Sequence, residues 1–514
     1  MSSGRLASLF KIVAFTAAIS FAFTGCKRKV EFSMPASEGA YDAQINGRTY
    51  IAVVDTLSTD SVAGHYYSLS EGSAADRHEF AMVKGKHELI LSSDGKKSSM
   101  NPKDISFNLH HEPEFVIAED TLSFRKQYSV FNEESDVIYG KAMGYWTSLQ
   151  GVEADISKAF TSGYIKSFKK KELDLSLDLY IPEKPEGNKP LIMFMHGGAF
   201  YVGDKKEPAY IDFCEYFASL GYVTASINYR MGFHLGKGEI ERAGYVALQD
   251  AHAAMRYIVS NADRYGIDKN RIFVAGSSAG SITALNLAFM DEDSRPESSY
   301  GGKGLFNDND LGEIDKSGNE IKASFKIKAV ANMWGAVSNL GMINNRRSDI
   351  ISFHGDADAI VPYAAGFPFS SAGKSVTRML SDTLYGSFCI DSVARKLGRR
   401  TEMHTFKGEG HALNTTGKEK QINNNHIFIR ERIEKFFYKE MVPVEASIVP
   451  IGEGKYILKG NAESVSWKVD GGFIIESSGN SVSVLWAVDS PTKCITASGT
   501  YKYGIGFIKR MTVN

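Results

Sequence analysis

The alternation of apolar and polar positions divides the chain into three regions. Residues 26–150 alternate in short bursts such as TYIAVVDTL and HELILSS, which are separated by turn-rich stretches such as SSDGKKSS. Such alternation is typical of short antiparallel strands that bury one face. The pattern predicts a small N-terminal β domain over this range, with no cluster of catalytic residue types in it.

The middle region, residues 151–441, contains longer apolar runs that alternate with amphipathic segments. PLIMFMHGG is nearly continuous in apolar character, as expected of a parallel strand buried on both faces, and PAYIDFCEYFASLGY follows with helical spacing. Repeated strand–helix alternation predicts an α/β fold with a doubly wound, mostly parallel sheet. A polar, glycine-rich stretch at residues 291–321 fits either a lid or a plain surface loop.

Residues 442–514 return to short alternating segments, including VSWKVDGGFIIES and NSVSVLWAV, with turns about every ten residues. This spacing predicts a C-terminal β-sandwich. The region resembles the immunoglobulin-like and PKD-like modules that are appended to secreted bacterial enzymes. Trp467 and Trp486 are interpreted as core residues of this module rather than as sugar-binding platforms.

The first 25 residues differ from the rest of the chain. Arg5 and Lys11 precede the apolar run IVAFTAAISFAF, which is too short to span a bilayer and is typical of a signal peptide. The run ends in Thr24-Gly25-Cys26, which resembles the lipobox of bacterial lipoproteins. The resemblance implies lipidation of Cys26 and a lipid-anchored protein of the bacterial cell envelope, in the periplasm or at the outer-membrane surface. Plain secretion is the alternative.

Composition narrows the classes of ligand. The formal net charge is −1, so no nucleic-acid partner is expected. The cysteines beyond Cys26 are Cys214, Cys389 and Cys494, and they form no CxxC pair and have no histidine at ligand spacing. The sequence therefore predicts no metal site, no cofactor and no disulfide.

One motif carries chemistry. Residues 276–280 read G-S-S-A-G and fit G-x-S-x-G with Ser278 as the nucleophile, between a predicted strand, RIFVAG, and a predicted helix, SITALNLAF. Such a strand-to-helix turn exposes the hydroxyl and points the helix N-terminus at developing negative charge. A serine nucleophile needs a base and an orienting carboxylate, in the chain order serine, acid, histidine. Downstream, ISFHGDADAIVPY offers Asp356 and Asp358, and FKGEGHALN offers His411.

With these motifs, residues 170–440 resemble the α/β-hydrolases of the esterase and lipase group, and most of all the feruloyl-esterase-like and carboxylesterase-like members with an HGGAF loop. In that group H-G-x-x-D-x-x-V-P places the acid at Asp358, which leaves Asp356 to cap the turn. The resemblance also implies an oxyanion hole formed by the backbone N–H groups of Gly197, Gly198 and Ala279. The helices that carry Cys214 and Cys389 would cover opposite faces of the sheet.

These residues together predict a serine esterase that forms an acyl-enzyme on Ser278 and acts on small-molecule or glycan esters, such as acetylated or feruloylated glycans. A serine peptidase of the prolyl-oligopeptidase type shares the fold and the triad. A glycan-binding surface lipoprotein with a vestigial hydrolase core is a rival from another class, and arylformamidase-type amide cleavage also fits the core. The sequence leaves the oligomeric state and the acyl preference open.

Overall fold

The computed structural model describes most of the chain after the signal-like segment, which together with Cys26 lies outside the described residues. The described ranges are 34–68, 74–75, 77–83, 89–93, 96–100, 105–116, 131–149, 169–184, 187–234, 236–301, 309–372, 381–416, 420–442, 444–501 and 505–513. Within these ranges no helix is both long enough and apolar enough to cross a membrane.

The N-terminal region forms one antiparallel seven-stranded sheet in the order β7-β6-β5-β3-β2-β1-β8. Alternate residues of β2 face opposite sides: Ala52 and Val54 join the core of this module, whereas Ile51 packs in a second cluster. The period-two pattern of the sequence therefore correctly predicts β-strands in this region. The bounds are β1 (Gly39–Ile45), β2 (Arg48–Leu57), β3 (Ser61–Ser68), β5 (His78–Val83), β6 (Leu89–Ser93), β7 (Lys96–Met100) and β8 (Ile105–Leu109).

The middle region is built on an eight-stranded sheet in the order β19-β16-β14-β13-β11-β12-β10-β9. Only β10 and β9 run antiparallel to their neighbours, and the other pairs are parallel. This strand order, in which β11 and β12 exchange places relative to their order in the chain, is that of an α/β-hydrolase. The bounds are β9 (Phe131–Gly144), β10 (Lys171–Pro182), β11 (Lys189–Met195), β12 (Val223–Ile227), β13 (Ile267–Ser277), β14 (Ile327–Met333), β16 (Asp349–Gly355) and β19 (Thr401–Phe406).

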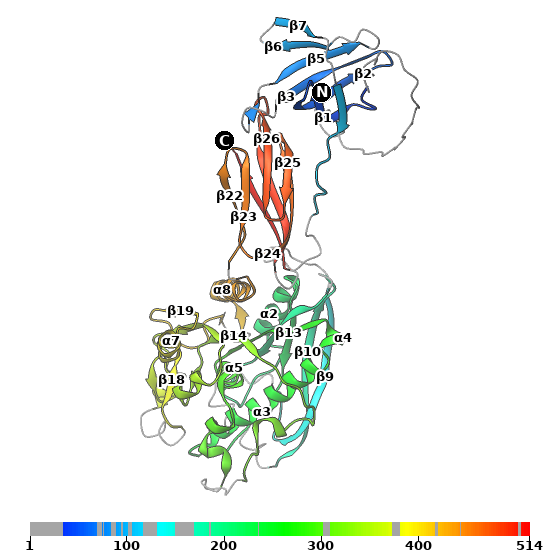
Figure 1. Ribbon diagram of the computed structural model, residues 1–514. Coiled ribbons are helices and arrows are strands. Elements are labelled where there is room, and N and C mark those ends of the chain that lie inside the picture. Colours follow the sequence, from blue (N-terminus) through cyan, green and yellow to red (C-terminus); the bar gives the residue numbers. More distant parts are fainter. Residues whose placement is uncertain are drawn as a thin grey trace.

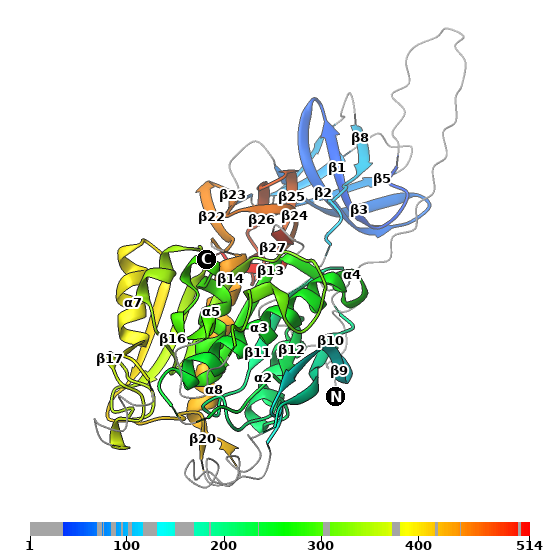
Figure 2. The same cartoon turned by 90° about the horizontal axis from the view of Figure 1, so that it is seen from below.

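Helices cover both faces of this sheet (Figure 2). One apolar cluster joins one face to α2 and α8, and the other cluster joins the opposite face to α3, α5 and α7. Cys214 on α2 and Cys389 on α7 accordingly lie on opposite faces, and both are free thiols. The bounds are α2 (Pro208–Ser219), α3 (Glu239–Ser260), α4 (Ala262–Tyr265), α5 (Ala279–Phe289), α7 (Ser387–Lys396) and α8 (Asn424–Met441).

The expected boundary at residue 150 is too late. β9 pairs with β10 from Phe131↔Pro182 to Gly144↔Lys171, so the α/β domain already includes residue 131. β9 is an edge strand in which only Tyr139 and Gly144 are buried, and it lacks the continuous apolar run that marks the buried parallel strands.

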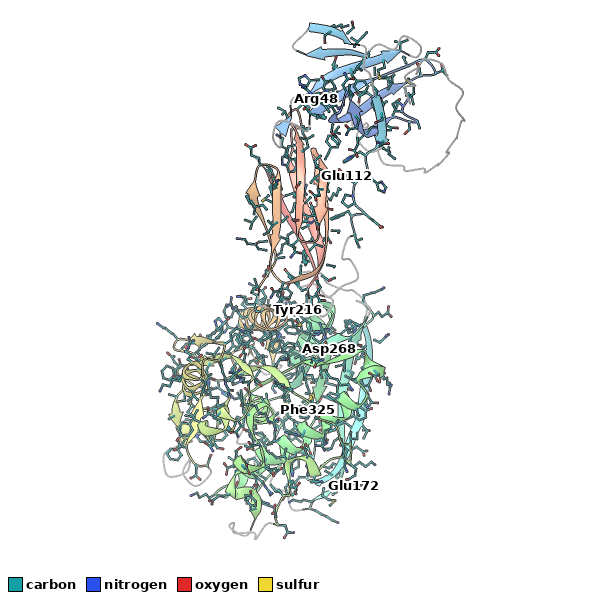
Figure 3. The ribbon with its side chains drawn as sticks, viewed as in Figure 1. Arg48, Glu112, Glu172, Tyr216, Asp268 and Phe325 are labelled. Atoms are coloured by element: carbon teal, nitrogen blue, oxygen red, sulfur yellow. The ribbon has the colours of Figure 1, made fainter. Side chains whose placement is uncertain are left out.

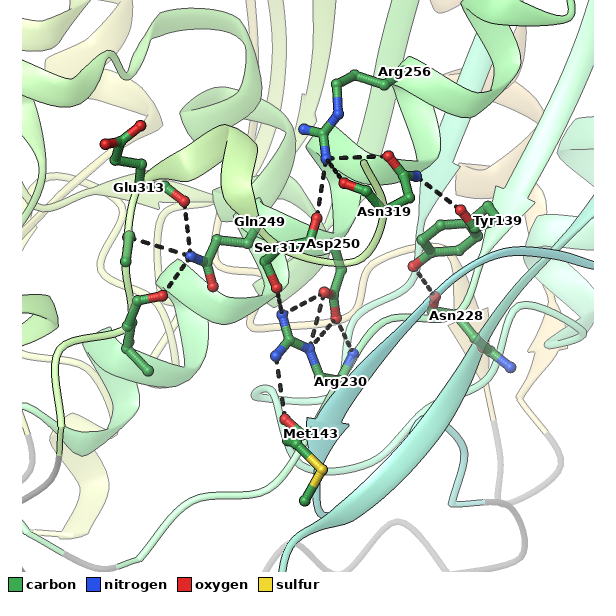
Figure 4. A network of polar contacts seen from close by, with 12 residues as sticks. Tyr139, Met143, Asn228, Arg230, Gln249, Asp250, Arg256, Glu313, Ser317 and Asn319 are labelled. Carbon is green, nitrogen blue, oxygen red and sulfur yellow. Dashed lines mark hydrogen bonds and ion pairs between the residues drawn. The ribbon is translucent and has the colours of Figure 1, made fainter. Parts of the chain in front are cut away.

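The described parts of residues 291–321 are hydrogen-bonded to α3 (Figure 4). Arg242 donates to the carbonyl oxygen of Ser298, and the Gln249 amide donates to three consecutive carbonyls from Leu311 to Glu313. A buried ion pair between Arg230 and Asp250, with N···O at 2.6 Å, ties the segment after β12 to the same helix. The short 3-10 turns here are η1 (Glu292–Ser294), η2 (Glu297–Tyr300) and η3 (Ile314–Lys316).

The C-terminal region is a pair of packed antiparallel sheets, in the orders β22-β23-β26-β25 and β24-β27-β28. Trp467 and Trp486 are 2% and 3% exposed and lie in its core, as the sequence predicts, and the Trp486 indole donates to the Tyr456 hydroxyl. The bounds are β22 (Ser447–Gly452), β23 (Lys455–Lys459), β24 (Ala462–Asp470), β25 (Gly472–Ser478), β26 (Ser481–Ala487), β27 (Cys494–Tyr501) and β28 (Ile505–Thr512).

The sandwich lies between the other two domains (Figure 1). β4 (Ala74–Ala75) of the N-terminal module adds to β26, and the Tyr67 hydroxyl donates to Asp489. On the other side, α8 leads directly into the sandwich. Asp268, at the start of β13, lies on the sandwich side of the α/β domain, and Glu172 lies at the far end (Figure 3). The sandwich therefore contacts the amino edge of the parallel strands, and their carboxyl edge faces away from both β modules.

The remaining strands are short and lie in the loops of the α/β domain. They form a three-stranded and a two-stranded sheet among the described residues. Their bounds are β15 (Ala336–Val337), β17 (Ala365–Gly366), β18 (Leu384–Gly386), β20 (Thr415–Thr416) and β21 (Gln421–Ile422), with 3-10 turns η4 (Leu340–Asn344) and η5 (Ser370–Ala372).

Candidate active site

Ser278 occupies the sharp turn between β13 and α5. Its backbone has φ 53° and ψ −121°, a strained conformation for a residue with a side chain, and its N–H is held by the carbonyl oxygen of Met333 at 2.9 Å. The neighbouring glycines are required by space: a Cβ at Gly276 would lie 2.3 Å from the carbonyl oxygen of Gly280, and one at Gly280 would lie 2.1 Å from that of Met195. The G-x-S-x-G motif is thus a geometric requirement of this turn.

The three residues predicted from the motifs lie within hydrogen-bonding distance of one another. His411, in the loop after β19, has Nε2 2.9 Å from Ser278 Oγ and Nδ1 2.7 Å from Asp358 Oδ2. Asp358 lies in the loop after β16. All three loops leave the carboxyl edge of the sheet, where sites of parallel α/β folds form. This chain of contacts can move a proton from the serine hydroxyl to the imidazole while a carboxylate faces the other ring nitrogen.

Asp358 is buried but is held as a carboxylate. Its side chain is 0% exposed, and Oδ1 accepts hydrogen bonds from the N–H groups of Ile360 and Val361 at 2.8 and 3.0 Å. Burial alone would raise the pKa of Asp358, but hydrogen bonds from His354 and His411, together with the N–H of Ile360, hold that pKa well below its ordinary value. The carboxylate therefore stays charged throughout the range in which His411 can act as a base.

Asp356, the other candidate acid, has a different environment. It is exposed, and its Oδ1 accepts a hydrogen bond from the N–H of Gly408 at 2.6 Å. That contact caps the turn between the loops that carry Asp358 and His411, as the motif frame implies.

The loop after β11 lies against the nucleophile. A Cβ on Gly197 would be 3.4 Å from the Cβ of Ser278, so the glycine permits close approach of this backbone to the reacting atom. Gly198 has φ 110°, and a Cβ there would lie 1.8 Å from the carbonyl oxygen of Val202. Ala279 is the first residue of α5, where helix N–H groups lack intrahelical partners. The three residues predicted to form the oxyanion hole thus belong to two backbone segments that flank Ser278.

Two residues of the site were not identified as such from the sequence. Tyr210, on α2, places its hydroxyl 2.6 Å from Ser277 Oγ and so hydrogen-bonds to the turn that carries Ser278. His354, which precedes the acid in the HGDAD motif, places Nε2 3.2 Å from Asp358 Oδ2. Tyr210 had no signal beyond an apolar position in an amphipathic helix, whereas His354 had one, since it shares the HGDAD motif with the acid.

A cavity lies beside the oxyanion loop. It is lined by residues after β9 and β12 and by the start of α3, and the N–H of Gly232 in its wall donates to the carbonyl oxygen of Phe200 at 2.9 Å. Its aromatic and charged lining includes Tyr145, Lys170, Phe233 and Arg242. Among the described residues, no group of three or more acidic, histidine or cysteine side chains is arranged to hold a metal ion.

Part of the chain matches a known protein family. Residues 177–372, which include the predicted oxyanion loop, Ser278 and Asp358, match the family model described as BD-FAE. The chain is similar to that family over this segment, which is less than half of its length. The match begins within β10 and ends before β19, so the BD-FAE segment lacks the loop that supplies His411.

Curated relatives match shorter stretches of the chain. Gut esterase 1 of Caenorhabditis elegans is 32% identical over 124 residues, which cover 23% of this chain and 22% of that protein. Para-nitrobenzyl esterase of Bacillus subtilis is 31% identical over 120 residues, covering 23% and 24%. The chain therefore spans about a quarter of the length of these relatives.

Solved structures cover more of the chain at lower identity. An esterase of the planctomycete Thermogutta terrifontis is 21% identical, with a TM-score of 0.37 over 52% of this chain and 88% of that one. A truncated carbohydrate esterase from gut microbiota is 18% identical, with a TM-score of 0.36 over 62% of this chain and 98% of that one.

Proposed function

We propose that the protein is a carboxylic ester hydrolase that uses Ser278 as its nucleophile. The observation that carries this proposal is the hydrogen-bonded series Ser278–His411–Asp358 at the carboxyl edge of the sheet, with the serine on a strained turn at the start of α5. The BD-FAE match and the esterase relatives support the same reaction class.

In this mechanism Ser278 Oγ attacks the ester carbonyl carbon while His411 Nε2 takes the hydroxyl proton. The resulting oxyanion accepts hydrogen bonds from backbone N–H groups of the 197–198 loop and of Ala279. His411 then gives the proton to the leaving alcohol, and water hydrolyses the acyl-enzyme with the roles reversed. Asp358 orients the imidazole and stabilises its charged form in both half-reactions.

We further propose glycans that carry acetyl or feruloyl esters as the substrate class. Support comes from the BD-FAE match, from the export-type segment at the N-terminus, and from two β modules that lie away from the catalytic edge. In the same proposal a lipid on Cys26 holds the protein in the bacterial cell envelope. Because the catalytic edge faces away from the N-terminal module, an anchor at that end would present the site outward. A Cys26→Ser variant that stays in the membrane fraction would contradict the anchor.

The test of the reaction compares the protein with its Ser278→Ala variant on 4-nitrophenyl esters from acetate to octanoate and on methyl ferulate. We expect turnover by the wild type, and its loss in the variant with an unchanged melting temperature. A preference for acetate or for methyl ferulate would favour glycan deacylation. Absence of wild-type turnover on every ester would contradict the proposal.

Dipeptidyl nitroanilides added to this panel separate the rival functions. A serine peptidase would cleave dipeptidyl nitroanilides in preference to esters, and a vestigial core would cleave neither. The described residues ahead of Phe131 form a single seven-stranded sheet rather than repeated blades, which gives no support to a propeller-bearing peptidase.

A further inference from the structure

A second imidazole contacts the aspartate of the triad. His354, the penultimate residue of β16, is fully buried, and its Nε2 lies 3.2 Å from Asp358 Oδ2 and 3.2 Å from the carbonyl oxygen of Val361. Both partners can only accept hydrogen bonds, because one is a carboxylate and the other a carbonyl. The proton of a neutral His354 therefore resides on Nε2, where the Val361 carbonyl oxygen accepts its hydrogen bond and Asp358 Oδ2 lies at the same distance.

The other ring nitrogen is fixed by a buried amide. The N–H of Gly335 donates to Asn332 Oδ1 at 2.9 Å, which orients the amide so that Asn332 Nδ2 donates to Ser387 Oγ, also at 2.9 Å. Ser387 Oγ lies 2.7 Å from His354 Nδ1. Since the serine oxygen already accepts from the amide, its own proton faces two acceptors, His354 Nδ1 at 2.7 Å and the carbonyl oxygen of Gly335 at 3.4 Å, and the imidazole is the nearer one. Each bond in the series thus runs in one direction, toward the aspartate.

This series is not exposed to bulk solvent along its length. Its members come from β14, the start of α7 and the end of β16, and each side chain is 0% exposed; they are Asn332, Ser387 and His354. Behind them, Ser281 on the helix that follows the nucleophile donates to Asn332 Oδ1 at 2.6 Å. Hydrogen bonds that polarise one another in a buried series hold their geometry more firmly than isolated ones.

We propose that His354 is a positioning residue of the triad, and that the series Asn332–Ser387–His354 holds Asp358 Oδ2 in the orientation that His411 requires while reducing the basicity of the Asp358–His411 pair. This inference rests on the proposed esterase function and deepens it. Oδ2 of Asp358 is shared by the two imidazoles, at 2.7 Å from His411 and 3.2 Å from His354. A carboxylate that shares one oxygen between two donors attracts each of them less strongly than it would attract one.

The titratable groups that face this series are few. Asp358 and His411 lie on the loops after β16 and β19, and the Tyr363 ring packs edge-on against His354 with centroids 5.7 Å apart. Asp356 and Glu409, on the same two loops, are exposed to solvent. The partners from β14 and α7 are neutral amide and hydroxyl groups. The charge balance at Asp358 is therefore set mainly by the two histidines.

Two substitutions of His354 separate its contacts. In His354→Gln the side-chain nitrogen reaches the position of Nε2 and keeps a donor toward Asp358. In His354→Asn the shorter amide reaches only the position of Nδ1 and keeps the contact with Ser387. His404→Asn is the matched control, because His404 lies on the neighbouring strand, stacks on Phe353 and binds Glu402 rather than the triad.

The measurement is the pH profile of kcat/KM for 4-nitrophenyl acetate, with melting temperatures for every variant. For His354→Asn we expect the acid limb to move up by about one pH unit and kcat to fall about tenfold, because His411 gains the whole attraction of the carboxylate. For His354→Gln the limb should stay within about 0.3 unit of the wild type. The acid limb of His404→Asn should coincide with that of the wild type. Equal limbs in all the variants, whatever their stability, would overturn the proposal and leave His354 a packing residue.

A second readout does not depend on turnover. The low-field proton resonance of the His411–Asp358 hydrogen bond, followed by NMR through a pH titration, should shift its midpoint upward in His354→Asn and not in His354→Gln. If the wild type hydrolyses no ester but this midpoint moves, the esterase proposal fails and the positioning role stands. If wild-type turnover is lost on Ser278→Ala but neither the limb nor the resonance moves, the positioning role alone fails.

Discussion

The two edges of the central sheet differ in the kind of side chain that they bring together. At the carboxyl edge, a strained serine, a buried carboxylate and two histidines meet in loops that depart from three strands. At the amino edge, one apolar cluster runs from the α2 and α8 face through Met441 and Val442 into the sandwich core. The parallel strands thus begin at an apolar packing interface with the sandwich and end at the polar residues of the candidate active site.

The contrast shows how strain is tolerated at the site. The φ of 53° at Ser278 persists only because the surrounding structure holds it, whereas the φ of 110° at Gly198 is open to glycine and strained for a residue with a Cβ. The amino edge supplies part of that support through area buried from water, which is not directional and tolerates change. We therefore expect a substitution at Ser278 to lower activity with little loss of stability, and substitutions at the amino edge to do the reverse.

The largest effect is expected at Ser278. Ser278→Ala removes the nucleophile and should lower kcat/KM for 4-nitrophenyl acetate by about 10⁴-fold or more, since removal of a triad member leaves only the contribution of the oxyanion hole and binding. Ser277→Ala is the matched control: it changes the adjacent hydroxyl, which faces Tyr210, and should cost less than tenfold. Equal losses in both variants would contradict the assignment of the nucleophile.

The next effect is expected in the oxyanion loop. Gly198→Ala would place a methyl group 1.8 Å from a carbonyl oxygen at φ 110°, so the loop must shift away from the position in which it can bind an oxyanion. We expect kcat to fall about 100-fold, the scale of losing one donor. Gly187→Ala is the control, with φ 83° but no atom within 4 Å of the new methyl group. It should cost about 1 kcal/mol of stability and leave kcat unchanged.

A change at the amino edge should produce the opposite result. The buried Tyr501 hydroxyl accepts a hydrogen bond from the N–H of Ala446 at 2.6 Å, at the junction of α8 with the sandwich. Tyr501→Phe leaves that N–H without its partner and should lower the free energy of unfolding by about 1–2 kcal/mol, measured in urea. Activity should be unchanged, and Tyr300→Phe at an exposed site should alter neither quantity. A fall in kcat would mean that the two edges are coupled.

The smallest effect concerns pH. Burial, followed by a hydrogen bond to Asp349, raises the pKa of Glu440 on α8 to about 7, against the attraction of Arg400. A raised carboxyl pKa contributes stability below its unfolded value, and that contribution is lost as pH rises through 7. Glu440→Gln should therefore stabilise the protein by about 1 kcal/mol more at pH 8 than at pH 5, whereas Glu431→Gln, exposed on the same helix, should show no such difference.

The pKa of Asp358 is lowered rather than raised, so its contribution to stability changes with pH in the opposite direction. Its lowered pKa contributes stability that is present above the ordinary aspartate value and is lost as pH falls toward the folded-state pKa. Asp358→Asn should therefore lose its destabilising effect only in strong acid. Denaturation curves at several pH values for Asp358→Asn and Glu440→Gln would show whether the two edges respond to pH in opposite directions.

Much of this protein could be predicted from local sequence. The G-x-S-x-G frame identified Ser278 because only small residues fit a turn in which Gly276 and Gly280 meet other backbone atoms. The HGDADAIVP frame separated Asp358 from Asp356, and continuous apolar runs such as PLIMFM identified the buried parallel strands. Alternation identified both β modules, and the buried Trp467 and Trp486 followed from the same pattern.

Other features were decided only by tertiary structure. β9 belongs to the central sheet because it pairs with β10, and the sequence of this edge strand does not predict that pairing. The roles of Tyr210 and His354 depend on contacts between elements far apart in the chain, such as His354 Nδ1 with Ser387 on α7. Sequence patterns report the period and the local turn geometry of a segment, since these arise from neighbouring residues. Which buried polar atoms meet across the sheet is set by strand register and helix packing, and only the folded chain determines these.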